Sequence, residues 1–306
     1  MKFNGCFSRE WQILNGVRQG GILSPYLFNI YIDDMIEEIL KLSVGCKLGI
    51  KKCNIIAYSD DICLLAPSIS ALQFILNKFY NCINYLNLKV NIKKSFCIKF
   101  IRKGKVFIKN NCIKLGESYL EFCDRIKYLC FIIEYNLCNK NDIKRQLNQF
   151  YKQFNTILRK FHFTSIEVKL KLFQSYCLSL YGSNFWTSDD KCKMTLNQFA
   201  VAYHKAIKRI LGVGNRESNH HVCYATGLLT FNHHININIF RFMKRIFNGS
   251  CAFIRTIMPY LKNYSNILRE TNEILKMKYD INSSILENDI DALCARVKFV
   301  FFEEFL

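Results

Sequence analysis

Two adjacent aspartates, Asp60 and Asp61, stand between two short apolar segments in the run Cys53-Asn-Ile-Ile-Ala-Tyr-Ser-Asp-Asp-Ile-Cys-Leu-Leu-Ala66. The apolar segments have the composition of strands, so the spacing predicts a β-hairpin whose turn carries both acids. Tight turns favour Asn-Gly or Asp-Gly because their residues need positive φ, and Ser59-Asp60-Asp61 contains no glycine. Two carboxylates on a rigid support suit a divalent metal ion, whereas an isolated acidic turn is more often simply solvated.

A loop with two consecutive glycines lies about forty residues upstream of the aspartates, in the run Gly16-Val-Arg-Gln-Gly-Gly-Ile-Leu-Ser-Pro-Tyr-Leu-Phe-Asn-Ile-Tyr-Ile-Asp33. The two glycines allow a ligand to approach the backbone closely. Ser24 is the expected N-cap and Pro25 the expected first residue of an amphipathic helix. The residues expected on the core face of this helix are Phe28, Ile32, Met35, Ile36 and Ile39.

These two runs resemble the reverse transcriptases of non-LTR (LINE-like) retrotransposons. The loop of that family typically reads G-V-R-Q-G-G-x-L-S-P-x-L-F-N-x-Y, and its catalytic hairpin reads Y-A-D-D. Here the hairpin is Tyr58-Ser59-Asp60-Asp61, in which a small serine replaces the usual alanine. Agreement of both motifs, in order and at a suitable spacing, makes the resemblance specific.

The resemblance continues beyond the hairpin. The run Leu86-Asn-Leu-Lys-Val-Asn-Ile-Lys-Lys-Ser95 looks like the L-x-x-N-x-x-K-[TS] segment of the family, which makes Lys94 a candidate for contacting the nucleotide phosphates or protonating the leaving pyrophosphate. A solvated strand end is the alternative for Lys93 and Lys94. The helix before this run has a predicted buried stripe of Leu72, Ile75, Leu76, Phe79 and Ile83.

The run Ile126-Lys-Tyr-Leu-Cys-Phe131 is similar to the K-Y-L-G segment that supports the primer end in the family. Cys130 stands where glycine is usual. We expect its Cβ and sulfur to crowd a primer backbone that approaches this position closely.

The resemblance implies nucleotide addition by phosphoryl transfer, in which two divalent ions flank the reacting phosphate. Magnesium is the expected ion because it prefers carboxylate oxygens to thiols, and manganese is a possible substitute. Asp60 would be the direct metal ligand and Asp61 a second one. The expected partners are an RNA template, a DNA primer and deoxynucleoside triphosphates. The residues that the resemblance places beside the nucleotide or template are Arg18, Gln19, Gly20, Gly21 and Tyr58.

The third carboxylate of this family does not occur in a matching motif among the 306 residues. In the family it lies on a strand upstream of the R-Q-G-G loop, in a segment of the form F-D-x-x-x-A-F-D. Asp33 and Asp34 follow the loop instead, where a polar helix face explains them. We therefore expect an N-terminally truncated reverse transcriptase, or fragment of one, that is inactive by itself. The alternatives are a non-catalytic nucleic-acid-binding remnant, a decayed open reading frame or, less favoured, a domesticated interaction protein.

The expected fold class is α+β. The resemblance implies an incomplete polymerase palm, a ferredoxin-like βαββαβ sheet lacking its first strand, followed by a mainly α-helical thumb and C-terminal region. We expect the partial palm in residues 1–135, the helical thumb in residues 136–214 and the C-terminal helical region in residues 215–306. Near the C-terminus, an amphipathic helix is expected to carry the apolar residues Ile285, Ile290, Leu293 and Val297.

The charge balance agrees with a nucleic-acid partner. Forty-three Lys and Arg against twenty-four Asp and Glu give a formal net charge of +19, which attracts phosphate backbones. Many of the cations share predicted helices with an apolar stripe of Ile143, Leu147, Phe150, Phe154 and Ile157. Their outer face either tracks a template–primer duplex or only solubilises the chain. These cations are Lys140, Lys144, Arg145, Lys152, Arg159, Lys160, Lys169 and Lys171.

No segment reaches about eighteen consecutive apolar residues, and the N-terminus lacks the apolar core of a signal peptide. We therefore expect an intracellular protein, cytoplasmic or nuclear, without a membrane partner. Its fifteen cysteines are then expected to be reduced, with no disulfide-linked partner.

Two groups of metal-ligating residue types also occur downstream. His220, His221 and Cys223 form one, and His233 and His234 the other. Their spacing matches no standard zinc site, so surface or partly packed histidines are the expected interpretation.

Overall fold

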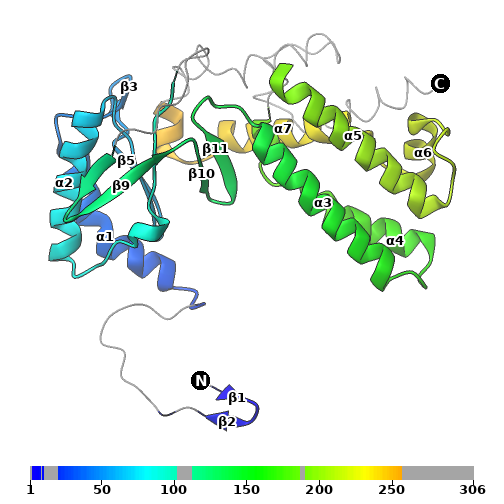
Figure 1. Cartoon of the computed structure of the whole chain (residues 1–306), viewed down its shortest axis with the longest axis horizontal. Helices are drawn as coiled ribbons and strands as arrows, with labels where there is room; N and C mark the ends of the chain where they lie inside the picture. Colours follow the sequence, from blue (N-terminus) through cyan, green and yellow to red (C-terminus); the bar gives the residue numbers. More distant parts are fainter. Residues whose placement is uncertain (1, 8, 10–19, 102–111, 187–189, 257–306) are drawn as a thin grey trace. The chain divides into compact units, whose positions relative to one another are not determined.

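The computed structural model describes residues 2–7, 9, 20–101, 112–186 and 190–256, and its architecture is α+β, as expected. The chain divides into two compact units (Figure 1). The described residues of the first unit fall within 1–95 and 112–120, and those of the second within 96–101 and 121–256. The expected C-terminal helix around residues 285–297 lies outside the described residues. Within the described residues, no helix is both long enough and apolar enough to span a bilayer.

The first unit combines two long helices with short antiparallel hairpins, in which β1 pairs with β2, β3 with β4, and β5 with β6. Its elements in chain order are β1 (Lys2–Phe3), β2 (Cys6–Phe7), α1 (Ser24–Lys41), β3 (Lys47–Leu48), β4 (Lys51–Lys52), β5 (Ile55–Tyr58), β6 (Asp61–Leu64), α2 (Ile69–Tyr85), the 3-10 helix η1 (Ile92–Lys94), β8 (Cys112–Leu115) and the first half of β9 (Ser118–Cys123).

Helix α1 begins one residue earlier than expected. Its N-cap is Leu23, no side chain caps it, and Ser24 is already helical, so the prediction of Ser24 as N-cap was wrong. The chain bends there through a backbone bond instead, in which the Ser24 N–H donates to the Gly21 carbonyl at 3.2 Å. The backbone bond satisfies one of the first N–H groups of the helix, which have no partner within it. Pro25 follows in the first turn, where its missing N–H costs nothing.

The core of the first unit lies between α1, α2 and the β5–β6 hairpin, which contact one another. On α1 the expected stripe is confirmed in Ile32, Met35 and Ile39, which are buried, while Phe28 and Ile36 are half-buried. The stripe on α2 is likewise confirmed, with Leu72 half-buried. Burying each such side chain contributes about 1.5–3 kcal/mol. The fully confirmed positions on α2 are Ile75, Leu76, Phe79 and Ile83.

Polar bonds at both ends of α2 hold it in place. Asn87 follows the helix with φ of 52°, and the Leu88 N–H donates to the Ile83 carbonyl at 3.0 Å, the pattern of a Schellman cap. At the other end, the Gln73 carboxamide donates to the Lys114 carbonyl at 2.7 Å and accepts from the Lys114 N–H at 2.8 Å. Gln73 thus satisfies backbone groups of strand β8 that a neighbouring strand would otherwise pair with.

The second unit is mainly helical. A short parallel pairing of β7 with β9 and an antiparallel β10–β11 hairpin precede the helices. Its elements are β7 (Cys97–Ile98), the second half of β9, β10 (Arg125–Tyr128), β11 (Phe131–Glu134), α3 (Lys140–Lys160), α4 (Ile166–Leu172), the π-helix η2 (Phe173–Cys177), the 3-10 helix η3 (Ser183–Phe185), α5 (Asp190–Leu211), α6 (Asn219–Thr226) and α7 (Phe231–Phe247).

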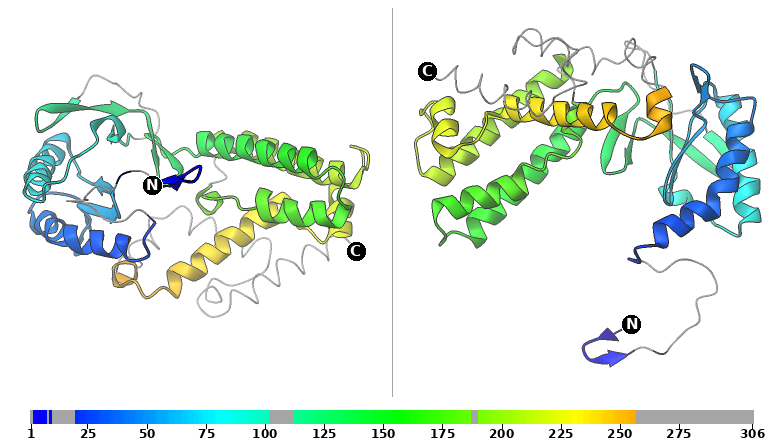
Figure 2. Two further views of the ribbon diagram at one scale, coloured as in Figure 1. Left: turned by 90° about the horizontal axis from the view of Figure 1, so that it is seen from below. Right: turned by 180° about the vertical axis from the view of Figure 1, so that it is seen from behind.

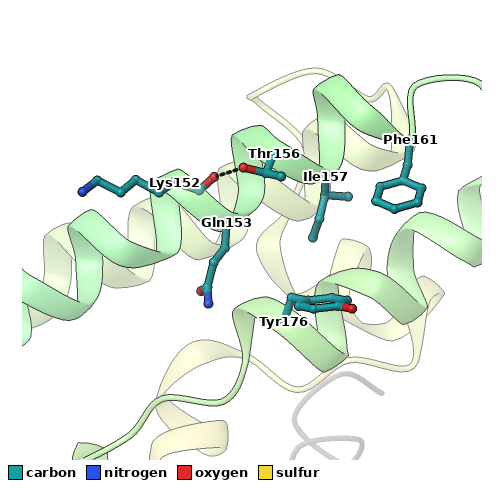
Figure 3. Close-up of a pocket in the computed structure, with 6 residues that line it drawn as sticks. All are labelled: Lys152, Gln153, Thr156, Ile157, Phe161 and Tyr176. Atoms are coloured by element: carbon teal, nitrogen blue, oxygen red, sulfur yellow. Dashed lines mark hydrogen bonds between the residues drawn. The ribbon is translucent and has the colours of Figure 1, made fainter. Parts of the chain in front are cut away.

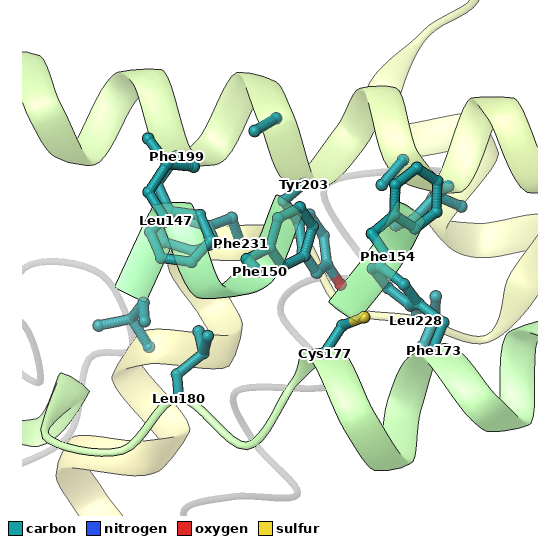
Figure 4. Close-up of a cluster of buried hydrophobic side chains, with 14 of the residues drawn as sticks. Leu147, Phe150, Phe154, Phe173, Cys177, Leu180, Phe199, Tyr203, Leu228 and Phe231 are labelled. Atoms are coloured by element: carbon teal, nitrogen blue, oxygen red, sulfur yellow. The ribbon is translucent and has the colours of Figure 1, made fainter. Parts of the chain in front are cut away.

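One hydrophobic cluster occupies the space between these helices, and α3 and α5 run side by side across it (Figure 2). The stripe predicted on α3 is confirmed, since all five of its residues are buried. Aromatic rings fill much of the cluster (Figure 4), with the Phe150 ring centroid 5.3 Å from that of Phe199 and 5.9 Å from that of Phe173. Such ring pairs add stabilisation beyond that of buried area alone.

A fully buried carboxylate, Asp142 in the first turn of α3, fixes the position of this helix. One of its oxygens accepts from the Ile132 N–H of β11 at 3.2 Å and from Nε and Nη2 of Arg145 at 2.9 and 2.7 Å. The other oxygen accepts from the indole N–H of Trp186 at 3.0 Å. Arg145, expected on the cationic outer face, is therefore engaged in an internal ion pair.

The turn of the β10–β11 hairpin holds Cys130 in a backbone conformation that favours glycine. Tyr128 pairs with Phe131, so Leu129 and Cys130 form a two-residue turn, and their φ angles are 44° and 63°. Both values lie in the left-handed region that type I′ hairpin turns require and that a Cβ disfavours. Cys130 therefore adopts a backbone conformation that its Cβ strains and that glycine would adopt without strain.

We expect Cys130→Gly to raise the free energy of unfolding by about 0.5–1 kcal/mol, because relief of left-handed strain outweighs the greater chain entropy of glycine. Cys130→Ala is the matched control, since it removes the sulfur and keeps the Cβ. Urea denaturation of both variants and the parent chain measures the difference. An equal gain from Cys130→Ala would show that the thiol, and not φ, causes the strain.

Candidate metal and nucleotide site

The aspartate pair lies at the tip of the β5–β6 hairpin, as the spacing predicted. Tyr58 pairs with Asp61 across the strands, which leaves Ser59 and Asp60 as a two-residue turn. Asp60 and Asp61 are both exposed, so their carboxylates are open to solvent and to a ligand. The Tyr58 side chain is also 66% exposed and stands on the strand directly opposite Asp61.

The turn is strained, as expected for a tight turn without glycine. Ser59 has a φ of 53°, in the region that a glycine would occupy without strain. A non-glycine residue held there costs on the order of 1–3 kcal/mol. The rest of the hairpin must therefore hold the turn in place.

Asn54, directly before β5, anchors the base of the hairpin. It is fully buried, and its Nδ2 donates to the Ile39 carbonyl at 3.2 Å and to the Val44 carbonyl at 3.0 Å. The backbone carbonyl of Asn54 accepts a hydrogen bond from the Leu65 N–H at 2.8 Å, just beyond β6. Gly45 has a φ of 127°, and any Cβ there would collide with the Asn54 carboxamide. The Asn54 side chain thus ties the start of β5 to the end of α1 and the loop after it, while its backbone carbonyl pairs with the chain just beyond β6.

The sequence reasoning missed Asn54 and Gly45 as positioning residues. The only signal was an uncharged polar residue at the start of an otherwise apolar strand-like run. The hydrogen bonds that hold its Nδ2 come from Ile39 and Val44, segments that a motif does not reveal.

The glycine loop is described only in part. Arg18 and Gln19 lie outside the described residues. Gly20 has a φ of 78°, a backbone angle that favours glycine, and a Cβ built there would meet no atom of the described residues within 4 Å. Gly21 is half-buried at the start of α1, where its carbonyl accepts from Ser24.

Lys94 lies on the 3-10 helix η1 and is exposed. In the described part of the chain, no hydrogen bond or ion pair joins it to Asp60 or Asp61. Its side chain is therefore available to a ligand.

A third acid does not join the pair within the described residues. No group of three or more His, Cys, Asp or Glu side chains there is arranged to hold a metal ion. Asp33 and Asp34 are exposed on α1. The ligand atoms at the hairpin tip are nevertheless carboxylate oxygens, which are the type of ligand that magnesium prefers.

The downstream histidines have internal roles in the second unit. His233 is buried, with Nδ1 2.7 Å from the Thr230 hydroxyl, and Nε2 of His234 lies 3.1 Å from the Leu178 carbonyl. Burial lowers the pKa of His234, which keeps its imidazole neutral. His220 and His221 are exposed on α6.

Comparison with known proteins matches residues 2–133 to the family described as reverse transcriptase (RNA-dependent DNA polymerase). A retrovirus-related Pol polyprotein from the type-2 retrotransposable element R2DM of Drosophila melanogaster is 35% identical over 95 residues, which are 31% of this chain and 9% of that protein. The Pol polyprotein from the retrotransposable element R2 of Popillia japonica is 31% identical over 126 residues, covering 40% of this chain and 18% of that protein.

The match to a third relative extends further along the chain. The RNA-directed DNA polymerase from the mobile element jockey of Drosophila funebris is 25% identical over 229 residues, or 68% of this chain and 23% of that protein. The chain thus spans less than a quarter of the length of these relatives. The matched region contains the glycine loop, the aspartate hairpin and the β10–β11 turn. Residues 2–133 of the chain therefore resemble reverse transcriptases, and the relatives that match are Pol polyproteins and an RNA-directed DNA polymerase of mobile elements.

Proposed function

We propose that this chain is part of an RNA-directed DNA polymerase of a non-LTR retrotransposon, in which Asp60 and Asp61 bind the catalytic metal ions. The observation that carries the proposal is the exposed acid pair on a strained turn within the region matched to the family. Divalent ions held there would lower the pKa of the primer 3′-hydroxyl and neutralise the leaving pyrophosphate. Magnesium is the proposed ion, with manganese as a substitute.

The chain's own residues would position the reactants around that tip. The glycines at positions 20 and 21 would let a nucleotide or template strand approach the backbone, with Arg18 and Gln19 as the neighbouring polar groups. Tyr58 presents an exposed ring next to the acids. Lys94 would donate to the triphosphate or protonate the leaving pyrophosphate, since its ammonium group is exposed. The anchor at Asn54 keeps the hairpin tip fixed while these groups bind.

The two acids need a third carboxylate, which we propose is not supplied by this chain alone. No matching motif occurs in its sequence, and the described residues gather no third ligand at the tip. The 306 residues would then bind metal and nucleic acid without extending a primer by themselves. The competing proposal is a non-catalytic nucleic-acid-binding remnant or a decayed open reading frame. It also allows nucleic-acid binding but predicts no specific metal binding at Asp60 and Asp61.

We further propose that residues 1–135 form the partial palm, residues 136–214 the thumb and residues 215–306 a C-terminal helical region. The cationic face of α3 and α4 would contact the template–primer duplex. It keeps that role without Arg145, which the buried Asp142 engages. Arg159 and Lys160 in the last turn of α3 are exposed and remain available to phosphates.

Metal binding tests the assignment of the acids. We expect the double variant Asp60→Asn/Asp61→Asn to lose most of the Mn²⁺ binding of the parent chain, because the carboxamides keep the size and remove the charge. Mn²⁺ binding is measured by electron paramagnetic resonance of the free ion. The matched control is Asp33→Asn/Asp34→Asn, which neutralises an equally adjacent, exposed pair on α1. Equal losses of Mn²⁺ binding in both variants would show that the hairpin acids bind the ion no more specifically than any other exposed acid pair.

Primer extension tests the need for a third acid. With Mg²⁺ or Mn²⁺, a DNA primer on an RNA template and all four deoxynucleoside triphosphates, we expect no extension by this chain, because two acids cannot hold both ions in place. Gel analysis of the labelled primer provides the measurement. Extension that Asp60→Ala abolishes would contradict this expectation and show that the chain completes its own site.

Salt dependence tests the cationic thumb face. We expect the dissociation constant for an RNA–DNA hybrid to rise steeply with salt, and Arg159→Ala/Lys160→Ala to reduce the slope of log Kd against log salt concentration by about 2, one for each lost phosphate contact. The control is Lys47→Ala/Lys51→Ala, which removes two exposed lysines from the β3–β4 hairpin. A hybrid affinity that salt leaves unchanged would refute binding through phosphates.

A further inference from the structure

A small pocket lies in the second unit between α3 and the π-helix η2. Its volume is about 220 Å³, below the 300–1,000 Å³ of pockets for drug-sized ligands, so it suits a single small ring system. In Figure 3 the Tyr176 ring lies across the pocket from Ile157 and Phe161. The residues that line it are Lys152, Gln153, Thr156, Ile157, Phe161 and Tyr176.

The backbone beside the pocket departs from ordinary helix geometry. Helix α4 ends at Leu172 and continues as the π-helix η2, an insertion that occurs often at functional sites. Phe173 and Cys177 of η2 are buried in the hydrophobic cluster, whereas the Tyr176 side chain between them is 58% exposed. The π-helix thus keeps two residues in the core and presents an aromatic ring to the pocket.

The pocket is mainly apolar inside, and one cation, Lys152, lines it. The Thr156 hydroxyl donates to the Lys152 carbonyl at 2.8 Å, so its hydrogen is already used by the helix backbone. Residues 144–181 contain seven Lys or Arg and a single acid, Glu167. Lys152 lines the pocket, and its ammonium group extends away from Tyr176 in Figure 3. An apolar slot floored by an aromatic ring, beside a cationic surface, complements a nucleobase joined to a phosphate.

We propose that this pocket holds one unpaired base of a single-stranded nucleic acid, stacked on Tyr176, with a neighbouring phosphate near Lys152. The proposal rests on the proposed nucleic-acid function and adds a contact that a duplex cannot make. Bases within a duplex are paired and stacked, so they present only phosphates and groove edges to a helix surface. Stacking is independent of sequence because every base has an aromatic face, so the pocket accepts RNA and DNA strands alike.

The test compares three ligands with the full chain by fluorescence anisotropy: a labelled oligouridylate or its oligothymidylate counterpart, an abasic strand of the same length, and a blunt duplex. We expect Tyr176→Ala to weaken binding of the base-containing strand about 5- to 100-fold and to leave the other two ligands unchanged. Tyr176→Phe keeps the ring and should stay within about two-fold of the parent. Tyr181→Ala is the matched control, since Tyr181 is 57% exposed and lies outside the pocket.

A second measurement separates stacking from any effect on folding. A strand that carries 2-aminopurine should lose fluorescence when it binds the parent chain and keep it with Tyr176→Leu at saturating protein. Equal weakening of all three ligands by Tyr176→Ala, or none, overturns the pocket while leaving nucleic-acid binding by the chain intact. Failure of the parent chain to bind any of the three overturns both the pocket and the proposed nucleic-acid partner.

Discussion

The buried carboxylate of Asp142 is the interaction on which the second unit depends. It sits in the first turn of α3 and accepts hydrogen bonds from β11, from Arg145 and from the indole of Trp186. Position 182 remains glycine for a related reason, because a Cβ there would strike the Phe131 ring and approach the Asp142 carboxylate. A buried charge is tolerated only when such donors surround it. One buried side chain thus joins the first turn of α3 to β11 and to Trp186.

Asn54 has the corresponding role in the first unit, with uncharged hydrogen bonds. Its carboxamide joins the start of β5 to the end of α1, so the hairpin tip projects from a base that cannot shift freely. The acids at the tip are exposed, whereas the strands below them contact the two helices. This arrangement offers ligands to a metal ion from one side, which is why the proposed function requires a further carboxylate on the other side.

Much of the site and fold was predictable because local patterns determine it. Two short apolar segments on either side of the acids predicted the hairpin and its turn, and helical spacing identified most of the buried residues of α1, α2 and α3. The predicted cap at Ser24 was wrong because a backbone bond from the preceding loop replaced the side chain. The sequence showed a cysteine where the resembling motif has glycine, but it did not show why glycine suits this position. The reason is the turn, in which Leu129 and Cys130 both have positive φ angles.

By itself, then, the sequence determined the likeness to reverse transcriptases, the acid pair and the elements that carry it, since motifs and periodicity depend on residues close together in the chain. Only the tertiary structure decided that Asn54 anchors the hairpin, that Asp142 withdraws Arg145 from the cationic face, and that a π-helix exposes Tyr176 beside α3. Arg145 is only three residues from Asp142, but Asp142 is buried against Ile132 and Trp186, and Asn54 is buried against Ile39 and Val44. No local pattern records which distant partner a buried polar group will bond.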